Sequence, residues 1–401
     1  MSNIAIIGGG ASGIMAAVAA VKNPSNTVTI YERGERIGRK ILATGNGRCN
    51  MTNINASISN YHGSDTEFVK SVINKFWVRD TLKMFGDMGI LYKVEDGGKV
   101  YPYSDQASAV LDVLRYRLQR DGVIIKCGFE AENVKKHGSG FVITSYKGET
   151  AYADKVIIAA GGKAAPNLGS NGSGYGILKA LGHHVTELTP SLVQIKTALD
   201  TAKKLQGIKL NANVTLGKFS EYGEVLFTEY GLSGPAIFSL SSRLSGQKKI
   251  FLDIMPEYSE KKLINILFER KNNNPDMMLE MFLVGMLNKR VGQIILKQAL
   301  NLPLSKPACE MEYSDIENVA RLIKKWEFEI SGTMSWNNAQ VTKGGVYTSE
   351  FDSETMESKK IKGIYASGEV LDIDGDCGGY NLQWAWSTGY IAGMNSGEVI
   401  V

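Results

Sequence analysis

The stretch "IAIIGGGASG", residues 4–13, decides the fold expected of this chain. Its first four residues are apolar, as in a buried strand, and the alanine-rich stretch that follows has the composition of a helix. Between them lies the spacing Gly8-x-Gly10-x-x-Gly13. In a dinucleotide-binding turn the first glycine permits the tight turn, the second lets the backbone approach a pyrophosphate, and the third lets helix and strand pack closely. The spacing predicts such a turn at the start of a Rossmann-type domain.

A second strand and an acidic residue follow at the distance that this motif requires. Residues 27–32, "TVTIYE", have the pattern of a strand that ends in Glu32, 19 residues after Gly13. A carboxylate at that place accepts a hydrogen bond from a ribose hydroxyl, and the N–H groups that open the helix would face the phosphates. The alternative is a glycine-rich turn in an α/β protein that binds no nucleotide. Strand, glycines, helix and acid together argue against it.

Further strand-to-glycine junctions favour FAD over a nicotinamide dinucleotide as the bound cofactor. An apolar strand runs into glycines at "IIAAGG" (157–162) and again at "GIYASGEV" (363–370), and "GGYNLQ" (378–383) opens a helix. Contacts spread over both ends of the chain suit a long ligand with a buried ring system. Residues 41–53, expected beside the ring, contain no His or Tyr, so we expect FAD to be bound without a covalent link. NAD(P)H would dock only transiently, as an electron donor.

The bulk composition is that of an ordinary globular protein. The chain has 401 residues, 43% hydrophobic and 21% charged, with a net charge of +4. So small a charge does not by itself indicate a nucleic-acid partner. The four cysteines form no CxxC pair, which favours a reducing cytoplasm and gives no sign of a metal site. No run of about 18 apolar residues occurs, so we expect no membrane partner. The oligomeric state is left open.

Two changes in sequence pattern suggest domain boundaries. Residues 1–190 and 341–401 carry the strand–glycine junctions and are expected to form one discontinuous FAD-binding domain of the α/β class. Residues 191–258 and 326–340 are rich in strand patterns and are expected to form a β-rich insert. Residues 259–325 carry helical periodicity and are expected to form a helical subdomain.

Longer motifs give a family resemblance over essentially the whole chain. The matching stretches are "GGGASG" (8–13), "GRKILATGNGRCNMTN" (38–53), "FTEYGLSGPA" (227–236), "GGVYTSEFDSETMESK" (344–359) and "GEVLDIDGDCGGYNLQWAWSTGYIAG" (368–393). With them the chain resembles the bacterial two-dinucleotide-fold flavoprotein family that includes aminoacetone oxidase and a bile-acid-associated flavin oxidoreductase. The resemblance implies tightly bound FAD in a glutathione-reductase-like Rossmann domain, with an inserted β-barrel-like subdomain and a helical subdomain. A smaller resemblance, through "TKGGV" and "YASGE", extends to the fumarate-reductase-type flavoproteins.

The resemblance and the motifs together place the expected cofactor contacts on particular residues. These contacts lie in the first turn, at the acid and its neighbours, in the loop at 44–50, at the later strand–glycine junctions and at the start of the last helix. The expected FAD-binding residues are Gly8, Gly10, Ala11, Ser12, Gly13, Glu32, Arg33, Arg39, Lys40, Thr44, Gly45, Asn46, Gly47, Arg48, Cys49, Asn50, Ala131, Ala160, Gly161, Gly368, Glu369, Gly379, Tyr380, Asn381, Leu382 and Gln383.

The loop "ATGNGRCNMTN" (43–53) is expected to lie along the isoalloxazine ring. Its two glycines would let backbone N–H groups approach the ring oxygens and N5, and such donors stabilise a reduced, anionic flavin. Arg48 would pair with a carboxylate or cover the ring, or else form a surface ion pair. Cys49 is expected to be a small packed residue, and the alternative is a redox thiol that meets Cys377 in space.

The stretch "QVTKGG" (340–345) is the best lead to the chemistry. It matches the His-x-Thr-x-Gly-Gly pattern of fumarate-reductase-type flavoproteins, except that Gln340 stands at the histidine position, which weakens a dicarboxylate-reductase assignment. Thr342 and Lys343 are the catalytic candidates, because a hydroxyl and a cation suit a carbonyl or carboxylate of a substrate. An exposed lysine at a strand end is the alternative. The four histidines are expected to be surface or core residues and not catalysts.

These observations predict an FAD-dependent oxidoreductase that transfers a hydride between flavin N5 and a small organic substrate. The resemblance implies either oxidation of an amine or aminoketone with oxygen, or reduction of a conjugated C=C bond with NAD(P)H. The insert is expected to cap the flavin and set specificity. Two alternatives stay open: an FAD-using RNA-modification protein, which the weak net charge argues against, and a non-catalytic electron carrier, which the large insert argues against.

Overall fold

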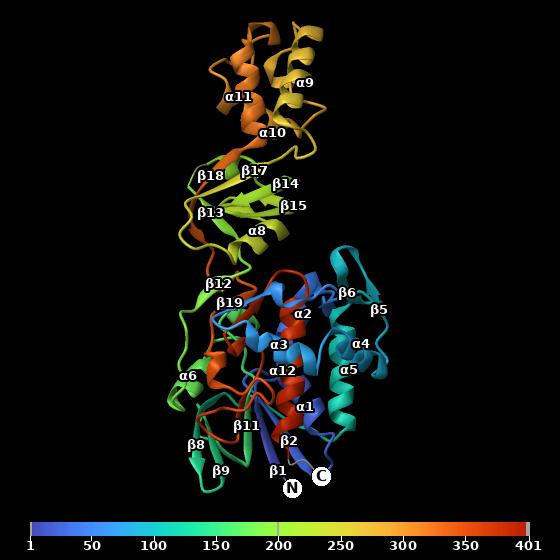
Figure 1. Ribbon diagram of the computed structural model, residues 1–401, viewed down its shortest axis with the longest axis vertical. Coiled ribbons are helices and arrows are strands. Elements are labelled where there is room, and N and C mark those ends of the chain that lie inside the picture. The colour runs from blue at the N-terminus through green and yellow to red at the C-terminus, as the bar shows by residue number, and fades with distance from the viewer. Residues whose placement is uncertain (1, 199, 398–401) are drawn as a thin grey trace. The chain divides into compact units, whose positions relative to one another are not determined.

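The computed structural model describes residues 2–198 and 200–397, and it divides into two compact units. The first unit contains Met1–Ser191 and Ser335–Val401, and the second contains Leu192–Met334. The chain therefore leaves the first unit after Ser191 and re-enters it at Ser335 (Figure 1).

A five-stranded parallel sheet forms the centre of the first unit, in the order β20-β11-β1-β2-β7. Its strands are β1 (Ser2–Ile7), β2 (Asn26–Glu32), β7 (Ile124–Cys127), β11 (Lys155–Ile158) and β20 (Ile364–Ala366). The apolar residues of β1 and β11 are almost completely buried, as expected for strands of a parallel sheet covered on both faces. Because β1 pairs with β2 on one side and β11 on the other, the strand order reverses there. Ligands of open α/β sheets bind at such a point, beyond the carboxyl ends of the strands.

Helix α1 (Ala11–Ala20) lies against helix α12 (Tyr380–Ser396), which comes from the other end of the chain (Figure 1). Two glycines of α12 make this contact possible. A Cβ atom on Gly389 would overlap the carbonyl oxygen of Ser12, and one on Gly393 would overlap the carbonyl oxygen of Ala16. Any residue other than glycine at these two positions would hold the helix backbones farther apart.

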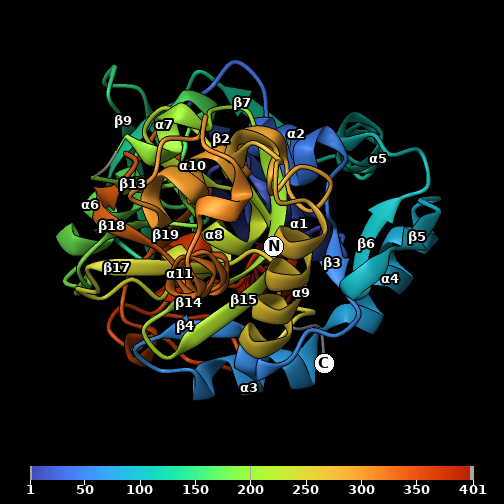
Figure 2. The same ribbon diagram turned by 90° about the horizontal axis from the view of Figure 1, so that it is seen from above.

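Smaller elements surround the sheet in the first unit. They include three two- or three-stranded sheets that bear on the site, in the orders β12-β19, β21-β4 and β3-β6-β5. Both views place α4, β5 and β6 together on one flank of this unit (Figure 1 and Figure 2). The remaining bounds are α2 (Arg39–Ala43), β3 (Thr52–Asn53), β4 (Tyr61–Gly63), α3 (Glu67–Lys75), α4 (Val78–Asp87), β5 (Tyr92–Val94), β6 (Lys99–Pro102), α5 (Ala107–Arg120), β8 (Ala131–His137), β9 (Gly140–Ser145), β10 (Thr150–Ala153), α6 (Ser173–Ala180), β12 (Thr189–Ser191), β19 (Val341–Lys343) and β21 (Ile373–Gly375).

The second unit contains a closed six-stranded barrel in the order β13-β16-β15-β14-β17-β18. Along β18, buried and exposed residues alternate, so that Trp326, Phe328 and Ile330 face the core with Phe227. The bounds are β13 (Ile195–Thr197), α7 (Thr201–Lys204), β14 (Lys209–Leu216), β15 (Phe219–Phe227), β16 (Gly231–Ser233), α8 (Pro235–Ser241), β17 (Lys249–Asp253), α9 (Glu260–Asn273), α10 (Lys289–Ala299), α11 (Tyr313–Lys324) and β18 (Trp326–Thr333).

This architecture confirms the expected fold class, an α/β Rossmann-type domain with an inserted β-barrel. Residues 335–340 were expected in the insert but cluster with the first unit. One reason is that the N–H of Ala165 donates to the carbonyl oxygen of Trp336 at 2.9 Å. Among the described residues, no helix combines the length and the apolar character needed to cross a bilayer.

The contact between α1 and α12 gives a stability prediction. We expect Gly389→Ala to lower the free energy of unfolding by about 1–3 kcal/mol, the usual cost of overpacking, because backbone and not a flexible side chain occupies the space. Chemical denaturation would measure the change.

Gly176→Ala in α6 is the matched control. A Cβ there meets no described atom within 4 Å, so alanine should be neutral or stabilise the helix by about 0.5–1 kcal/mol. Equal effects of the two substitutions would contradict the close-packing interpretation.

Candidate functional site

The first glycine-rich turn gives its three glycines three different environments. Gly8 has a φ of 107°, a conformation that favours glycine, and a Cβ there would lie 2.5 Å from the carbonyl oxygen of Ala159. A Cβ on Gly13 would overlap the carbonyl oxygen of Gly8, whereas no described atom lies within 4 Å of a Cβ on Gly10. The turn thus leaves open space beside Gly10, at the N-terminus of α1, where a pyrophosphate is expected.

Glu32 joins this turn to the next loop. Its Oε2 accepts the N–H of Gly9 at 2.8 Å, and its Oε1 accepts the N–H of Gly34 at 2.7 Å. A carboxylate has about four lone-pair sites, so both oxygens keep the capacity to accept a ribose hydroxyl. The two backbone bonds hold the carboxylate in place for that contact, which stays a prediction.

Basic residues gather beside Glu32. A groove of about 650 Å³ is lined by three arginines and one acid together with small residues: Arg33, Gly34, Glu35, Arg36, Arg39, Pro166 and Gly169. Arg33 donates to the carbonyl oxygen of Gly169 at 3.2 Å, which holds one wall of the groove in place. Three arginines in a polar groove next to the expected ribose site suit a ligand that carries phosphates.

The third strand–glycine junction packs onto the start of α1. Gly368 has a φ of 78°, and a Cβ there would lie 2.5 Å from the hydroxyl oxygen of Ser12. The N–H of Gly368 donates to Thr388 Oγ1 at 2.9 Å. The hydroxyl of Ser367 is buried and has no hydrogen-bond partner among the described residues. This junction therefore places Ser367 and Gly368 beside the first turn of α1, although more than half of the chain separates them in sequence.

Glu369 is the next residue of this junction, and its carboxylate connects the junction to the stretch at 340–345. Its Oε2 accepts Lys40 Nζ at 2.7 Å, and its Oε1 accepts the N–H of Thr342 at 2.8 Å. The second junction, at Gly161 (φ 71°), follows β11 on the same edge of the sheet. Three expected cofactor residues, Lys40, Gly161 and Glu369, thus lie at the carboxyl ends of the strands.

The loop at 44–50 has an unusual backbone. Gly45, Asn46 and Gly47 have φ values of 57°, 56° and 84°, and Cys49 has a φ of 61°. Positive φ costs energy for a residue other than glycine and is often found at functional sites. The N–H of Cys49 donates to the carbonyl oxygen of Thr44 at 3.0 Å and closes the loop.

The two loops expected beside the flavin ring meet in the structure. Asn53 Nδ2 donates to the carbonyl oxygen of Gly378 at 3.1 Å, although 325 residues separate them. A Cβ on Gly379 would lie 2.6 Å from the carbonyl oxygen of Thr52 and 2.8 Å from Asn50 Oδ1. That Oδ1 atom is buried and has no partner among the described residues. A buried acceptor without a partner at this junction fits a bound group that donates a hydrogen bond, as a flavin does.

Two side chains near the start of α12 form hydrogen bonds within the protein. Gln383 is fully buried, and its amide is used internally: Oε1 accepts Thr52 Oγ1 at 2.6 Å, and Nε2 donates to Thr81 and Ser387, each at 2.8 Å. Asn381 holds the preceding loop through two 2.8 Å bonds with the backbone of Gly375. Both donors of the Gln383 amide are therefore already used within the protein, and the contact with FAD that was expected of this residue stays a prediction.

Arg48 forms a partly exposed ion pair with two carboxylates of the chain, and the contact with FAD that was expected of it stays a prediction. Its Nη1 lies 2.9 Å from Glu95 and 3.4 Å from Asp105, and its guanidinium lies 3.9 Å from the centre of the Tyr101 ring. These contacts fix the outer side of the loop at 44–50. A partly exposed ion-pair network of this kind contributes mainly to geometry.

Cys49 does not have the properties of a reactive thiol. Its side chain is fully buried, and burial raises the pKa of the thiol to about 12. Reactive cysteines are instead partly exposed and have lowered pKa values. The packed-residue interpretation therefore agrees with the structure, and the thiol-relay alternative does not.

The hydroxyl oxygen of Thr342 forms hydrogen bonds within the protein, and the catalytic role expected of this residue stays a prediction. Thr342 is buried, and its Oγ1 accepts the N–H groups of Lys163 at 2.8 Å and Ala164 at 3.0 Å. Its role is to join β19 to the loop after β11. The sequence match at 342–345 did not distinguish a site-facing hydroxyl from one that binds the backbone.

Lys343 is partly buried, and its charge acts on the carboxyls of Asp372 and Asp374. Neither aspartate was singled out from the sequence. The alternation Asp-x-Asp-x-Asp over 372–376 was the available signal, because residues two apart share one face of a strand.

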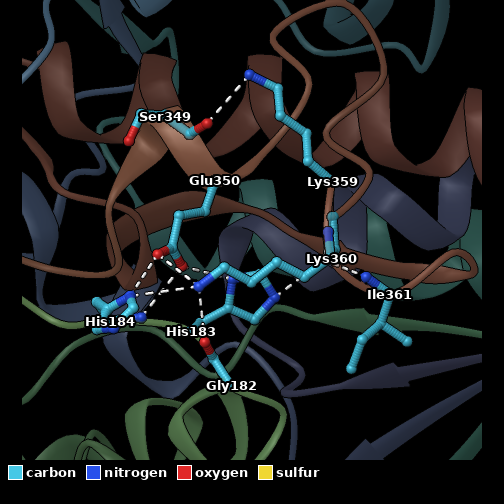
Figure 3. Close-up of polar contacts among 9 residues, drawn as sticks. Gly182, His183, His184, Ser349, Glu350, Lys359, Lys360 and Ile361 are labelled. Carbon is cyan, nitrogen blue, oxygen red and sulfur yellow. Dashed lines mark hydrogen bonds and ion pairs between the residues drawn. The ribbon is translucent and has the colours of Figure 1, made fainter.

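The histidine pair at 183–184 forms a charged cluster (Figure 3). Glu350 accepts His183 Nδ1 at 2.8 Å, His184 Nδ1 at 2.6 Å and Lys360 Nζ at 2.7 Å, and Ser358 Oγ lies 3.0 Å from His183 Nε2. Burial by itself would raise the pKa of Glu350, but these donors lower it to about 2. Burial lowers the pKa of His183.

The Ser358–His183–Glu350 order resembles a hydrolase triad but lacks a free nucleophile. The Ser358 oxygen also accepts the N–H groups of Lys360 at 3.1 Å and Ile361 at 3.0 Å, and the residue is buried. The cluster therefore holds the turn at 182–184 against the segment at 350–361, and the histidines are structural, as expected.

Comparisons with known proteins were made for the whole chain. A family description, the HI0933-like protein Rossmann domain, matches residues 2–395. The 3-dehydro-bile acid delta(4,6)-reductase of Clostridium scindens is 40% identical over 99% of this chain and 100% of its own length. The ribosomal RNA dihydrouridine synthase of Haemophilus influenzae is 32% identical over 97% of each chain. Among solved structures, the quinol fumarate reductase of Escherichia coli matches the fold with a TM-score of 0.51 at 17% identity, over 98% of this chain and 69% of that one.

The position of Glu32 gives a prediction about the cofactor. We expect Glu32→Ala to weaken FAD binding by about 1.5–3 kcal/mol, the usual value of a hydrogen bond to a charged group. Titration of the apoprotein with FAD would measure the change. Glu132→Ala on β8, an exposed glutamate, is the control and should bind FAD like the wild type. Unchanged affinity of Glu32→Ala would place the ribose contact on another residue.

The environment of Cys49 predicts its reactivity. At neutral pH a pKa of about 12 leaves a thiolate fraction about 10³-fold below that of an ordinary cysteine. Iodoacetamide should therefore modify the exposed Cys309 in the native protein and Cys49 only after unfolding, as followed by mass spectrometry. Rapid native modification of Cys49 would restore the redox-thiol alternative.

The buried His183 predicts acid sensitivity. Because its folded pKa is lowered, the unfolded chain binds the proton more readily, and stability falls as the pH drops through the ordinary histidine value of about 6.5. The contribution of Glu350 is present above its unfolded pKa and is lost only in strong acid, as the pH falls toward about 2.

The variant His183→Asn separates these contributions. It should lose part of the stability change between about pH 7 and pH 5 and should be less stable at neutral pH by about 1–3 kcal/mol, because Ser358 loses its partner. His137→Asn, at an exposed position at the end of β8, should retain the wild-type profile. Thermal unfolding across pH would test both, and parallel profiles for His183→Asn and the wild type would count against this account.

Proposed function

The chain belongs to the HI0933-like family and is a flavin-dependent oxidoreductase, and from this premise we propose that it reduces a C=C bond conjugated to a carbonyl group. One observation carries the proposal: full-length relatives of two kinds are named for reactions on such a bond. A delta(4,6) bond system next to a 3-keto group is a conjugated enone. Uridine becomes dihydrouridine when its C5=C6 bond, which is conjugated to the C4 carbonyl, gains two hydrogens. The shared chemistry is a polarised alkene.

We propose that FAD is the bound cofactor and is held by the residues around the first turn, the groove of arginines and the two loops that meet at Asn53 and Gly378. The open space beside Gly10 and the unpaired acceptor of Asn50 support this assignment. When bound, FAD supplies the hydride that an electron-poor alkene carbon accepts. NAD(P)H is the proposed donor that reduces the flavin, and it would bind transiently.

The polar residues near Lys343 suit a substrate with a carbonyl group. A cation directed at the carbonyl oxygen withdraws electrons from the conjugated carbon and stabilises the negative charge that develops when a hydride arrives. Lys343, whose charge already acts on two neighbouring carboxyl groups, is the proposed residue for this role. This direction of electron flow replaces amine oxidation as the preferred reaction, because the relatives' names point to reduction.

A small polycyclic enone is the first candidate substrate, since the bile-acid reductase is the more similar of the two kinds of relative. A uracil base in ribosomal RNA is the second, and the 32% identity over 97% of the chain favours it.

We also propose a cytoplasmic location. The supply of NAD(P)H there and the four free cysteines of the described chain support it.

The reaction can be tested in one anaerobic experiment. The purified protein should be yellow and release its FAD on acid precipitation, and NADH or NADPH should bleach the flavin. A 3-keto-delta(4,6) steroid should then restore the oxidised spectrum and gain two hydrogen atoms per flavin, as shown by mass spectrometry. Ribosomal RNA without dihydrouridine would be the parallel substrate.

The controls decide between the classes. The matched saturated 3-keto steroid should not reoxidise the flavin, because it has no conjugated bond. Reoxidation by oxygen alone, with neither steroid nor RNA reduced, would overturn the proposed reduction and restore the oxidase alternative.

A further inference from the structure

A pair of short strands holds a buried carboxyl close to the proposed flavin loops. Strand β21 pairs antiparallel with β4, and Asp374 lies directly opposite His62. Cross-strand partners of this kind have neighbouring side chains on one face. Asp374 is only 2% exposed, and Asp372, two residues earlier on the same face, is only 4% exposed.

The carboxyl groups of Asp372, Asp374 and Asp376 differ in the hydrogen bonds and ion pairs that they form. Asp376 Oδ1 lies 2.8 Å from His62 Nε2, and Asp372 Oδ2 accepts the N–H of Ser64 at 3.1 Å. Asp374 accepts one long hydrogen bond, from the hydroxyl of Ser191 at 3.5 Å. A buried carboxylate needs several strong donors to stay ionised, so the surroundings of Asp374 favour its protonated form.

The charges that face Asp374 come from each element around it. His62 on β4 and Lys343 on β19 favour its ionised form, whereas Asp372 and Asp376 oppose it. Burial is the largest influence and raises the pKa of Asp374 to about 7. The carboxyl is therefore suited to exchange its proton near neutrality, and Lys343 and His62 favour the carboxylate once the proton has left.

The backbone connects this carboxyl to the proposed site. β21 ends at Gly375, three residues before Gly378, whose carbonyl oxygen accepts Asn53 from the other proposed flavin loop. On the opposite side, a Cβ on Gly345 would lie 2.5 Å from the carbonyl carbon of Leu371, so the stretch with Lys343 is pressed against the start of β21. The segment with Asp374 is thus joined through its backbone to the junction of the two loops, and it begins beside the stretch that contains Lys343.

We propose that Asp374 supplies the proton consumed when the conjugated C=C bond is reduced. The inference rests on the proposed function. When bound and reduced by the proposed NAD(P)H donor, FAD would supply the hydride for the C–H bond at one alkene carbon. The π electron pair then takes the proton of Asp374 to form the second C–H bond. The product gains two hydrogens, and the Asp374 carboxylate that is left faces Lys343 and His62 until solvent returns a proton.

The variant Asp374→Asn keeps the shape and removes the proton. Flavin content and the rate of flavin reduction by NAD(P)H should be unchanged, while the rate of flavin reoxidation by the enone should fall by about 10²–10⁴-fold. The limb of the pH profile near neutrality should disappear. Asp154→Asn is the control: this aspartate accepts the N–H of Asn3 at the amino-terminal end of β11, far from the site along the strand.

A second measurement does not depend on turnover. With aspartate labelled at the carboxyl carbon, NMR of the wild-type holoenzyme should show one carboxyl that titrates near neutral pH. That signal should be missing from Asp374→Asn and retained in Asp154→Asn.

The two measurements separate the proposals. An Asp374 signal that titrates at the usual acidic value, or an Asp374→Asn enzyme with the wild-type reoxidation rate, would overturn the role of Asp374. A wild-type enzyme that reduces neither steroid nor RNA would instead overturn the proposed function, and the titration would still decide whether Asp374 holds the proton.

Discussion

The close contact between α1 and α12 is the constraint on which the rest of the first unit depends. Gly389 and Gly393 let the C-terminal helix rest on the carbonyl groups of Ser12 and Ala16, at the helix that follows the dinucleotide turn. With α12 fixed there, the turn at Gly378–Gly379 reaches the loop at 44–53, and Gly368 reaches Ser12. A site built from both ends of a 401-residue chain thus requires a helix contact too close for side chains.

The carboxyl groups of the first unit have two different roles. Glu32, Glu350 and Glu369 each accept two or more strong hydrogen bonds, and they join segments that are distant in sequence. Asp374 is buried with a single long contact. The first kind holds segments of the structure together, whereas the second is suited to gain and lose a proton. The difference lies in the number of donors within reach, since the residue type is nearly the same.

The chemistry proposed for this chain needs only a few groups of the protein. A flavin carries the electrons, so the chain must hold the ring, polarise a carbonyl and supply one proton. The loops around Asn50 and Gly379 suit the first task, and Lys343 and Asp374 suit the other two. Much of the stretch at 340–345 has a structural role: Thr342 binds backbone N–H groups, Gly344 packs against the backbone of Glu187, and Gly345 packs against that of Leu371.

The sequence by itself determined the features that depend on local spacing. The Gly8–Gly10–Gly13 turn, Glu32 at the end of the second strand, the Rossmann-type sheet and the β-rich insert follow from patterns within about 30 residues, because backbone conformation and strand burial are local properties. Only the tertiary structure decided that Gln383 and Thr342 are internal, that Arg48 pairs with Glu95 and Asp105, and that Asp374 faces His62 and Lys343. Burial and the distance to partners decide whether a polar group is paired within the protein or available to a ligand. Both depend on segments that can lie more than 300 residues apart in the sequence.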